Sequence, residues 1–451
     1  MIPVLTPEEM RAVDASAVEP VEELIRRAAD AVARAAVELM GGTYGRRVVV
    51  VAGPGNNGND GRVAAELLRR RGVHVSVFST ETTPAELPPC DLVIDAAFGT
   101  GFRGSFGFPD VGAAPVLAVD ICSGLSGLTG LAAGSPATAV ATVTFAALKP
   151  GLLFGDGPSH GGEVLLADIG LDVRRARAHL VTDADVVAWV PQRAPDAHKW
   201  RHAVWVVAGA PHMAGAARLC AEAALRGGAG YVRLSTPGVE HPDAPVEAVL
   251  HPLGTEGWAA QVCAGSDRFA AVAVGPGLGR DEATVQQVHA LAGSLARPLV
   301  LDGDALWALG TDAPAVLSER SAPTVLTPHD GEFERLTGSA PGDDRLSAAR
   351  ELAAATQVVV LLKGPTTVVA APDGACLLVR AGDARLASAG TGDVLTGLVA
   401  AHLALGADPW RAAAGAAHLH GRAAACGPAR GLVASDLPRL LSAAWESLGV
   451  D

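Results

Sequence analysis

Short apolar runs alternate with amphipathic segments along most of this chain. In the first half the runs that predict strands are Arg46–Ala52, Val73–Ser79, Asp91–Ala96, Pro115–Asp120, Ala141–Ala146 and Glu163–Ala167. In the second half they are Ala203–Ala208, Tyr231–Ser235, Ala270–Val274, Pro298–Leu301, Thr324–Leu326 and Val358–Leu362. Nearly continuous apolar strands are buried on both faces. Their alternation with helices predicts an α/β protein built on parallel, doubly wound sheets.

The segments between these strands predict helices. A first helix is expected over Pro7–Leu39, where acidic residues come early and arginines later, as the helix dipole favours. Further helices are expected over Arg62–Arg71, from near Gly392, and over Asp408–Cys426 and Leu437–Leu448. The proline-bearing stretch Val186–Arg201 predicts a boundary. We therefore expect two domains, residues 1–188 and residues 195–451.

Composition narrows the class of protein. A chain of 451 residues with 49% hydrophobic and 18% charged residues can bury two or more cores. The net charge of −13 disfavours nucleic acid and anionic membranes as partners, but it leaves room for a small anionic ligand. The six cysteines are widely spaced, which predicts reduced thiols. No signal-peptide pattern or long apolar run is seen, so we expect a cytoplasmic protein.

Two glycine-rich turns each connect a predicted strand to a predicted helix. The first is Gly53–Gly61 (GPGNNGNDG), and the second is Ala389–Asp393 (AGTGD). Glycines let backbone N–H groups approach a ligand closely, and the N-terminus of a helix binds anions, phosphate above all. The two turns therefore predict two separate sites for phosphorylated ligands.

In the first half the turn Gly55–Gly61 is followed by Asp95–Gly101 (DAAFGTG) and by Asp120–Ser123 (DICS). Together these segments resemble the Rossmann-like epimerases that act on hydrated NAD(P)H, with Asn59 in place of a family glycine and Cys122 in place of a proline. The resemblance implies that Asp120 faces the reacting ring and transfers a proton. It implies a potassium site made of oxygen ligands from Asn57, Asp95 and Ser123. The implied substrate contacts are Asn56, Asn57, Gly58, Asn59, Asp60, Gly99, Thr100, Gly101, Phe102, Arg103, Gly104, Ser105 and Asp120.

Two residues of the first half keep alternative interpretations. Asp60 could serve only as the N-cap of the helix that follows the turn. Lys149, which stands where the resembling family places a lysine, could carry a phosphate of the substrate or support the structure.

In the second half Gly390–Asp393 follows four other polar turns, each after a predicted strand. These turns are Gly275–Gly279 (GPGLG), Asp302–Leu306 (DGDAL), Thr327–Phe333 (TPHDGEF) and Lys363–Thr367 (KGPTT). In this order they resemble the ADP- or ATP-dependent NAD(P)H-hydrate dehydratases of the ribokinase-like fold. The resemblance implies that Asp393 deprotonates the attacking hydroxyl while glycine amides hold the phosphoryl group and Mg²⁺ bridges the phosphates. The implied contacts are Ala216, Gly277, His329 and Asp393 for the hydrated dinucleotide and Lys363, Gly364, Pro365, Thr366, Thr367 and Gly392 for the nucleotide.

Several polar residues of the second half have a simpler structural interpretation beside the functional one. Glu332 could assist magnesium or anchor its loop, and Asp302 and Asp304 could be structural. His198 and His202 have a spacing that zinc can use on a helix, but Pro195 argues against a metal site here. Two positions depart from the resembling family: Trp200 replaces a glycine and Asp330 stands where proline is common.

The two resemblances together predict one bifunctional repair enzyme. An epimerase would interconvert the R and S hydrates, and a dehydratase would return the S form to NAD(P)H with ADP or ATP as co-substrate. The alternative is a ribokinase-like small-molecule kinase whose first half is a non-catalytic sensor. A binding scaffold for RNA is a third interpretation, which the acidic balance disfavours. By analogy with the dehydratases we expect a homo-oligomer formed through the C-terminal domain.

Overall fold

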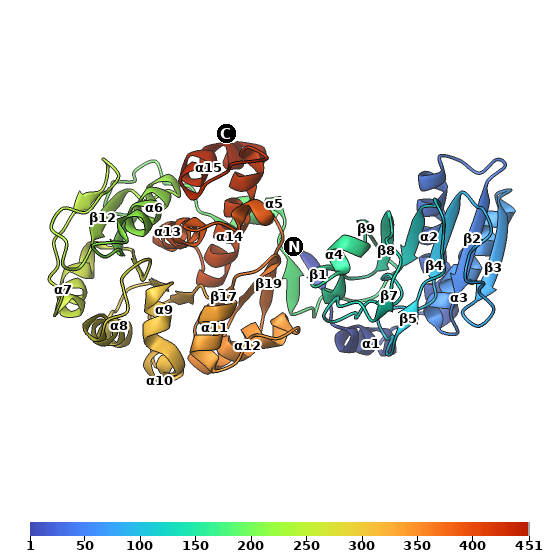
Figure 1. The fold of residues 1–451 in the computed structure, drawn as a ribbon, viewed down its shortest axis with the longest axis horizontal. Helices are drawn as coiled ribbons and strands as arrows, with labels where there is room; N and C mark the ends of the chain where they lie inside the picture. Colours follow the sequence, from blue (N-terminus) through green and yellow to red (C-terminus); the bar gives the residue numbers. More distant parts are fainter. Residues whose placement is uncertain (450–451) are drawn as a thin grey trace. The chain divides into compact units, whose positions relative to one another are not determined.

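The chain folds into two compact units (Figure 1). A computed structural model describes residues 1–449. One unit is Ile2–Ala178, and the other is His179–Asp451 together with Met1. Both are α/β units with parallel strands at their centre, as the sequence predicts. Within the described residues, no helix combines the length and the apolar character needed to cross a membrane.

The N-terminal unit is built on a six-stranded sheet in which every paired strand is parallel. The strand order is β3-β2-β4-β6-β8-β9. Their bounds are β2 (Arg47–Ala52), β3 (His74–Ser79), β4 (Leu92–Ala96), β6 (Val116–Val119), β8 (Ala141–Phe145) and β9 (Glu163–Ala167). The chain leaves β2 for one neighbour, β3, and then crosses to the other, β4. Ligands of doubly wound sheets bind at such a reversal, outside the carboxyl ends of the strands.

The predicted helix Pro7–Leu39 is wrong in one respect, because the structure has two helices here. They are α1 (Pro7–Ala15) and α2 (Val21–Met40). Pro20 directly precedes α2, and a proline disfavours helical backbone in the residue before it, so the helix cannot run through. The next helix, α3 (Asn56–Arg70), begins at the glycine turn itself, earlier than the predicted Arg62. The remaining short elements of this unit are β1 (Ile2–Val4), β5 (Phe106–Gly107), β7 (Gly134–Ser135), η1 (Pro150–Leu152) and α4 (Gly157–His160).

The sheet of the C-terminal unit has the strand order β10-β19-β18-β17-β16-β15-β14-β11-β12-β13. The strands from β17 to β13 pair in parallel, whereas β17, β18 and β19 pair antiparallel. Strands β18 and β19 were not predicted from the sequence. The bounds are β10 (Ala178–Leu180), β11 (Ala203–Val207), β12 (Tyr231–Ser235), β13 (Val249–Leu250), β14 (Ala271–Val274), β15 (Leu299–Leu301), β16 (Thr324–Leu326), β17 (Val359–Leu362), β18 (Thr367–Ala370) and β19 (Cys376–Val379).

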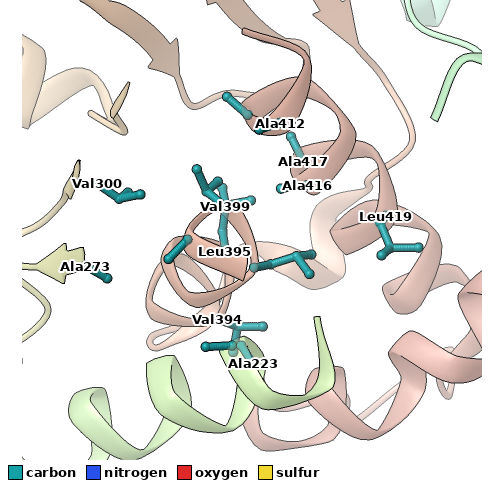
Figure 2. Packing of buried hydrophobic residues seen from close by; sticks show 14 of the residues in the cluster. Ala223, Ala273, Val300, Val394, Leu395, Val399, Ala412, Ala416, Ala417 and Leu419 are labelled. Atoms are coloured by element: carbon teal, nitrogen blue, oxygen red, sulfur yellow. The ribbon is translucent and has the colours of Figure 1, made fainter. Parts of the chain in front are cut away.

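Small side chains allow the helices of the C-terminal unit to pack closely. Figure 2 shows Val394, Leu395 and Val399 of α13 (Thr391–Ala404) between Ala223 of α6 (Ala214–Arg226) and alanines of α14 (Pro409–Cys426). At Gly397 an added Cβ would lie 2.1 Å from the carbonyl oxygen of Cys220, so only glycine fits between α13 and α6. This packing fixes the first turn of α13. The other helices are α5 (Asp183–Trp189), α7 (Trp258–Gly265), η2 (Ser266–Arg268), α8 (Glu282–Ser294), α9 (Asp304–Leu309), η3 (Gly310–Asp312), α10 (Ala313–Leu317), α11 (Asp330–Thr337), α12 (Arg345–Thr356), η4 (Ala384–Leu386), η5 (Ala434–Asp436) and α15 (Leu437–Ser447).

Two candidate active sites

The N-terminal unit contains a cavity of about 500 Å³ at the carboxyl ends of β2, β4 and β6. This is the reversal point of the sheet, where a ligand is expected. Eight of the residues predicted to contact substrate line it, namely Asn56, Asn57, Asp60, Gly99, Thr100, Gly101, Phe102 and Asp120. The other predicted contacts, Gly58, Asn59, Arg103, Gly104 and Ser105, are not part of its lining. The structure thus brings the glycine turn, the Gly99–Phe102 loop and Asp120 to one place.

Two members of the glycine turn have roles inside the protein. An added Cβ at Gly58 would lie 1.9 Å from the carbonyl oxygen of Gly53, so Gly58 is required for the tight strand-to-helix turn. Asn59 lies in α3 without a positive φ, and its Oδ1 accepts a hydrogen bond from Arg62 at 3.3 Å. The replacement of the family glycine by Asn59 therefore needs no special backbone conformation.

Asp120 has an unusual backbone conformation, and it pairs with a lysine whose N–H donors are all used within the protein. Its φ is 69°, in the left-handed region that non-glycine residues seldom adopt and that is often found at functional sites. Its Oδ1 lies 2.6 Å from the Nζ of Lys149, and its Oδ2 accepts a hydrogen bond from the backbone N–H of Thr100 at 3.2 Å. Lys149 is buried and also donates to the Oγ1 of Thr144 and the carbonyl of Phe145, each at 2.9 Å. All three donors of this ammonium are therefore used within the protein.

Asp60 is not a helix N-cap, which corrects one of the two interpretations given above. The N-cap of α3 is Gly55, and Asp60 lies inside the helix with 7% of its surface exposed. Burial, together with the charges of Asp120 and Asp14, raises the pKa of Asp60 to about 8. A carboxyl group with this pKa is largely protonated at neutral pH.

The three residues expected to hold potassium supply hard oxygen ligands. Asp95 is fully buried on β4, where it accepts hydrogen bonds from the Oγ of Ser123 at 2.5 Å and the backbone N–H of Ser123 at 2.8 Å. Within the described residues no basic group lies within 4 Å of its carboxylate, and burial raises its pKa to about 6. The Nδ2 of Asn57 is buried without a hydrogen-bond partner. A buried carboxylate without a counter-charge fits a monovalent cation.

The second site lies at the carboxyl ends of strands β14 to β17 in the C-terminal unit. Asp302 follows β15 and Lys363 follows β17, and their Oδ1 and Nζ are 2.8 Å apart. Asp302 also accepts hydrogen bonds from Thr327, which follows β16, at 2.8 Å and from Thr396 of α13 at 2.7 Å. One buried carboxylate thereby ties three strand ends to the helix that carries Asp393.

Among the described residues, Asp393 has no ion-pair partner, in contrast to Asp302, Asp304 and Glu332. It lies in the first turn of α13, whose N-cap Gly390 has a φ of 91°. Burial raises the pKa of Asp393 to about 7; the charge of Asp302 raises it as well, whereas Lys363 lowers it. An added Cβ at Gly392 would lie 3.5 Å from the Nζ of Lys363, so the glycine turn runs beside this lysine. A carboxyl group with a pKa near neutrality suits a general base.

His329 and Glu332 form the capping box of α11. The Nδ1 of His329 accepts hydrogen bonds from the backbone N–H groups of Gly331 at 3.1 Å and Glu332 at 3.2 Å. A neutral ring consequently carries its proton on Nε2. Glu332 accepts from the backbone N–H of His329 at 2.9 Å and lies 3.4 Å from the Nζ of Lys363. Glu332 therefore anchors the loop and adds negative charge beside Lys363.

The other predicted residues surround this centre. An added Cβ at Gly277 would be 3.0 Å from the Cβ of Ala216, so these two positions are in contact. In the predicted nucleotide segment, Lys363, Gly364, Pro365 and Thr366 form the turn between β17 and β18, and Thr367 begins β18. Arg345 donates to the carbonyl of Lys363 at 2.6 Å and pairs with Asp330 at 2.8 Å.

Sequence reasoning missed Arg345, Thr327 and Thr396 as supporting residues. Thr396 follows Asp393 by three positions, so helical spacing could have placed it on the same face of α13.

Among residues 1–449, no group of three or more His, Cys, Asp or Glu side chains is arranged to hold a metal ion.

Known proteins match both halves of the chain. A family model described as NAD(P)H-hydrate dehydratase matches residues 204–446, and one described as YjeF-related protein N-terminus matches residues 21–88 and 79–151. The chain is 36% identical to the bifunctional NAD(P)H-hydrate repair enzyme of Salinibacter ruber, over 96% of this chain and 94% of the relative. It is 39% identical to the enzyme of that name from Mycobacterium tuberculosis, over 87% and 86% of the two chains.

A solved structure supports the fold of the second unit. The ADP/ATP-dependent NAD(P)H-hydrate dehydratase from Bacillus subtilis, co-crystallised with ATP and Mg²⁺, is 33% identical with a TM-score of 0.52. The match covers 59% of this chain and 97% of that one. The fold and the two sites define a two-domain α/β enzyme with a ribokinase-like second half. The chain belongs to the family of bifunctional NAD(P)H-hydrate repair enzymes.

Proposed function

We propose that this protein repairs hydrated NADH and NADPH in two steps, one in each unit. The N-terminal domain, within residues 1–188, interconverts the R and S hydrates. The C-terminal domain, within residues 195–451, removes water from the S form with ADP or ATP. The observation that carries the proposal is the position of Asp393 in a glycine turn at the N-terminus of α13. Asp393 has no ion-pair partner among the described residues, and its pKa is raised to about 7.

In the dehydratase, Asp393 takes the proton from the hydroxyl group on the ring carbon beside the nitrogen. The oxygen then attacks the terminal phosphorus, and the bond between that phosphorus and the bridging oxygen breaks, so that AMP leaves from ADP or ADP leaves from ATP. Backbone N–H groups of Gly390–Gly392 stabilise the charge on the transferring phosphoryl group. The ring then loses phosphate, a better leaving group than hydroxide, together with a proton from the adjacent carbon, which restores the dihydropyridine.

The nucleotide lies along Lys363, Gly364, Pro365, Thr366, Thr367 and Gly392, and the hydrated dinucleotide contacts Ala216, Gly277, His329 and Asp393. Lys363 is held at 2.8 Å from Asp302, so its ammonium is fixed before the nucleotide arrives. Magnesium, when bound to the phosphates, neutralises the charge that develops during transfer. Crystallisation of the Bacillus subtilis relative with ATP and Mg²⁺ supports this assignment.

In the epimerase, the ring nitrogen allows the hydroxyl group to leave with a proton as water, and water returns to the opposite face. The stereocentre is lost in the intermediate iminium ion and reformed on either side. Asp120, which is paired with Lys149 at 2.6 Å, transfers the proton in this cycle. The substrate occupies the cavity lined by the glycine turn and Gly99–Phe102 and extends along Arg103–Ser105.

Asn57, Asp95 and Ser123 would hold potassium in this domain through their side-chain oxygens. The buried carboxylate of Asp95, which has no counter-charge among the described residues, supports this proposal. When bound, potassium would supply a fixed positive charge that orients the glycine turn beside Asp120.

The alternative of a small-molecule kinase with a non-catalytic sensor is not favoured, because relatives named as bifunctional repair enzymes match both halves of the chain. We further propose a homo-oligomer formed through the C-terminal domain, which light scattering would test.

The experiment that tests the proposed function follows the reduced-nicotinamide absorbance while the enzyme acts on a racemic hydrate. Complete recovery of NADH in the presence of ADP or ATP requires both activities, whereas a dehydratase alone consumes only the S form quickly. Free phosphate is measured in parallel. Formation of a stable phosphorylated metabolite in place of NADH and free phosphate would contradict the proposal.

A further inference from the structure

The break between α1 and α2 gives the N-terminal cavity a wall that the sequence did not predict. Because the chain turns at Ser16–Pro20, α1 contributes Met10, Arg11 and Asp14 to the lining. None of these residues belongs to the glycine turn or to the loops that the family resemblance identifies. Side chains four apart, such as Met10 and Asp14, lie on one face of a helix, so α1 presents one face to the cavity.

The charged residues that line the cavity lie partly in its depth and partly at its rim. Asp60 and Lys149 are buried, with 7% and 1% of their surfaces exposed, so they lie deep. Arg11, Asp14 and Gly101 are exposed residues of the same lining and therefore mark the rim, where Arg11 is the cation of these three. The substrate proposed above has a nearly neutral ring at one end and a doubly charged pyrophosphate in the middle. With the ring beside Asp120, the pyrophosphate comes to lie toward the rim.

Arg11 and Lys149 are the basic side chains among the described residues that line the cavity. The three N–H donors of Lys149 already bond to Asp120, Thr144 and Phe145. Arg11 uses its Nε on the carbonyl of Pro7 at 3.2 Å, and within residues 1–449 its two terminal nitrogens have no hydrogen bond or ion pair. The two terminal nitrogens of Arg11 are therefore available to bind an anion.

We propose that Arg11 is a cationic contact for the phosphate groups of the hydrated dinucleotide, in addition to the Arg103–Ser105 segment, and holds them at the rim while the ring reaches Asp120. This inference rests on the proposed epimerase function. The backbone N–H groups at the N-terminus of α3 contribute to the same anion site, and Arg11 adds the full charge that a dipole lacks. Arg11 is thus a binding residue that α1 supplies and that lies outside the proton-transfer chemistry.

The test compares Arg11→Gln and Arg11→Lys with Arg70→Gln in epimerisation assays. Arg70 is exposed at the far end of α3, about 20 Å along the helix from the glycine turn, so its replacement is a matched loss of one charge. The substrates are hydrated NADH and the hydrate of reduced nicotinamide riboside, which lacks phosphate. Thermal unfolding and the dehydratase activity of each variant report folding.

We expect Arg11→Gln to raise the KM for hydrated NADH about tenfold with kcat nearly unchanged. Arg11→Lys should recover most of this loss, and Arg70→Gln should match the wild type. The KM for the phosphate-free hydrate should be the same in all variants. An equal rise for both substrates, or none for hydrated NADH, would overturn the role of Arg11.

A second measurement serves if Arg11→Gln does not fold. The KM of the wild type for hydrated NADH should rise with ionic strength, and the KM for the phosphate-free hydrate should not. The same salt dependence for both substrates would contradict the inference. Failure of the wild type to interconvert the R and S hydrates would instead contradict the proposed function itself.

Discussion

The two sites use the same three parts, a glycine turn at a helix N-terminus, an aspartate and a lysine, but they pair them differently. In the N-terminal unit the lysine, Lys149, lies 2.6 Å from the proposed catalytic Asp120. In the C-terminal unit Lys363 pairs instead with Asp302 at 2.8 Å, and Asp393 has no ion-pair partner among the described residues. The difference decides which of the two proposed catalytic carboxyl groups has a lysine counter-charge and which does not.

This pairing agrees with the two proposed reactions. Phosphoryl transfer needs a base that takes a proton once and a cation for the nucleotide, so separating Asp393 from Lys363 keeps both functions available. Epimerisation adds and removes the same proton. Asp120, which pairs with Lys149, and Asp60, whose pKa of about 8 keeps it largely protonated, line the same cavity, so a proposed base and an acid lie together.

The largest effect is expected from Asp393→Asn. The amide keeps the shape but cannot accept the hydroxyl proton, so dehydration should slow by about a thousandfold, within the range of general-base catalysis. Epimerisation should continue, because its residues lie in the other unit. The recovery of NADH absorbance from the S hydrate measures the first activity, and chromatographic separation of the R and S forms measures the second. Normal dehydration by this variant would refute the assignment of Asp393.

The complementary change is Asp120→Asn, which should slow epimerisation by about a hundredfold or more while dehydration of the S hydrate stays normal. The pairing of Asp120 with Lys149 predicts a cost in stability as well, because the variant leaves a buried ammonium without its counter-charge. Lys149→Met on the Asp120→Asn background removes that charge and should recover stability without recovering activity. Recovery of both would show that Asp120 acts only as a structural partner of Lys149.

Much of the fold and of the two sites could be predicted from the sequence, and the features that were missed have physical causes. The strands β9, β12 and β16 have their predicted bounds, because apolar runs between turn residues identify buried strands. The hairpin β18–β19 was missed, since two four-residue apolar runs are not distinguishable from helix segments.

Within the sites, the sequence identified the turns but not their partners. Asp120 and Lys149 are 29 positions apart in the sequence, and Asp302 and Lys363 are 61 positions apart. These ion pairs therefore depend on the tertiary fold. The positive φ of Asp120 likewise follows from the surrounding fold rather than from its residue type.

The raised pKa of Asp393 predicts opposite effects of pH on activity and on stability. As a base Asp393 must be ionised, so kcat/KM for dehydration should rise with pH through about 7. The folded pKa lies above the ordinary value of 3.8, so the native state binds more protons than the unfolded state between these values. Its contribution to stability therefore falls as the pH rises from about 4 to about 7.

Asp393→Asn should remove this second effect. Denaturant unfolding should find the variant more stable than the wild type by a few kcal/mol at about pH 8, and nearly equal to it at about pH 4. A wild type and a variant with parallel stability profiles would contradict the raised pKa, whatever the variant's activity.

The smallest predicted effect concerns Asp304, whose charge helps to raise the pKa of Asp393. Asp304 pairs with Arg280 at 2.7 Å and accepts a hydrogen bond from the backbone N–H of Gly279 at 2.9 Å. Asp304→Asn should lower the pKa of Asp393 and move the rising limb of the pH–rate profile for dehydration toward acid by a fraction of a unit.

Asp330→Asn is the matched control, because Asp330 is an exposed carboxylate of the same unit that pairs with Arg345 and is not among the main charges that shift the pKa of Asp393. An acid shift in Asp304→Asn alone would show that the unpaired state of Asp393 is tuned by its acidic neighbours. Equal shifts in both variants would mean that overall charge sets its pKa. In that case the contrast between the two lysine pairings would not explain why Asp393 serves as a base.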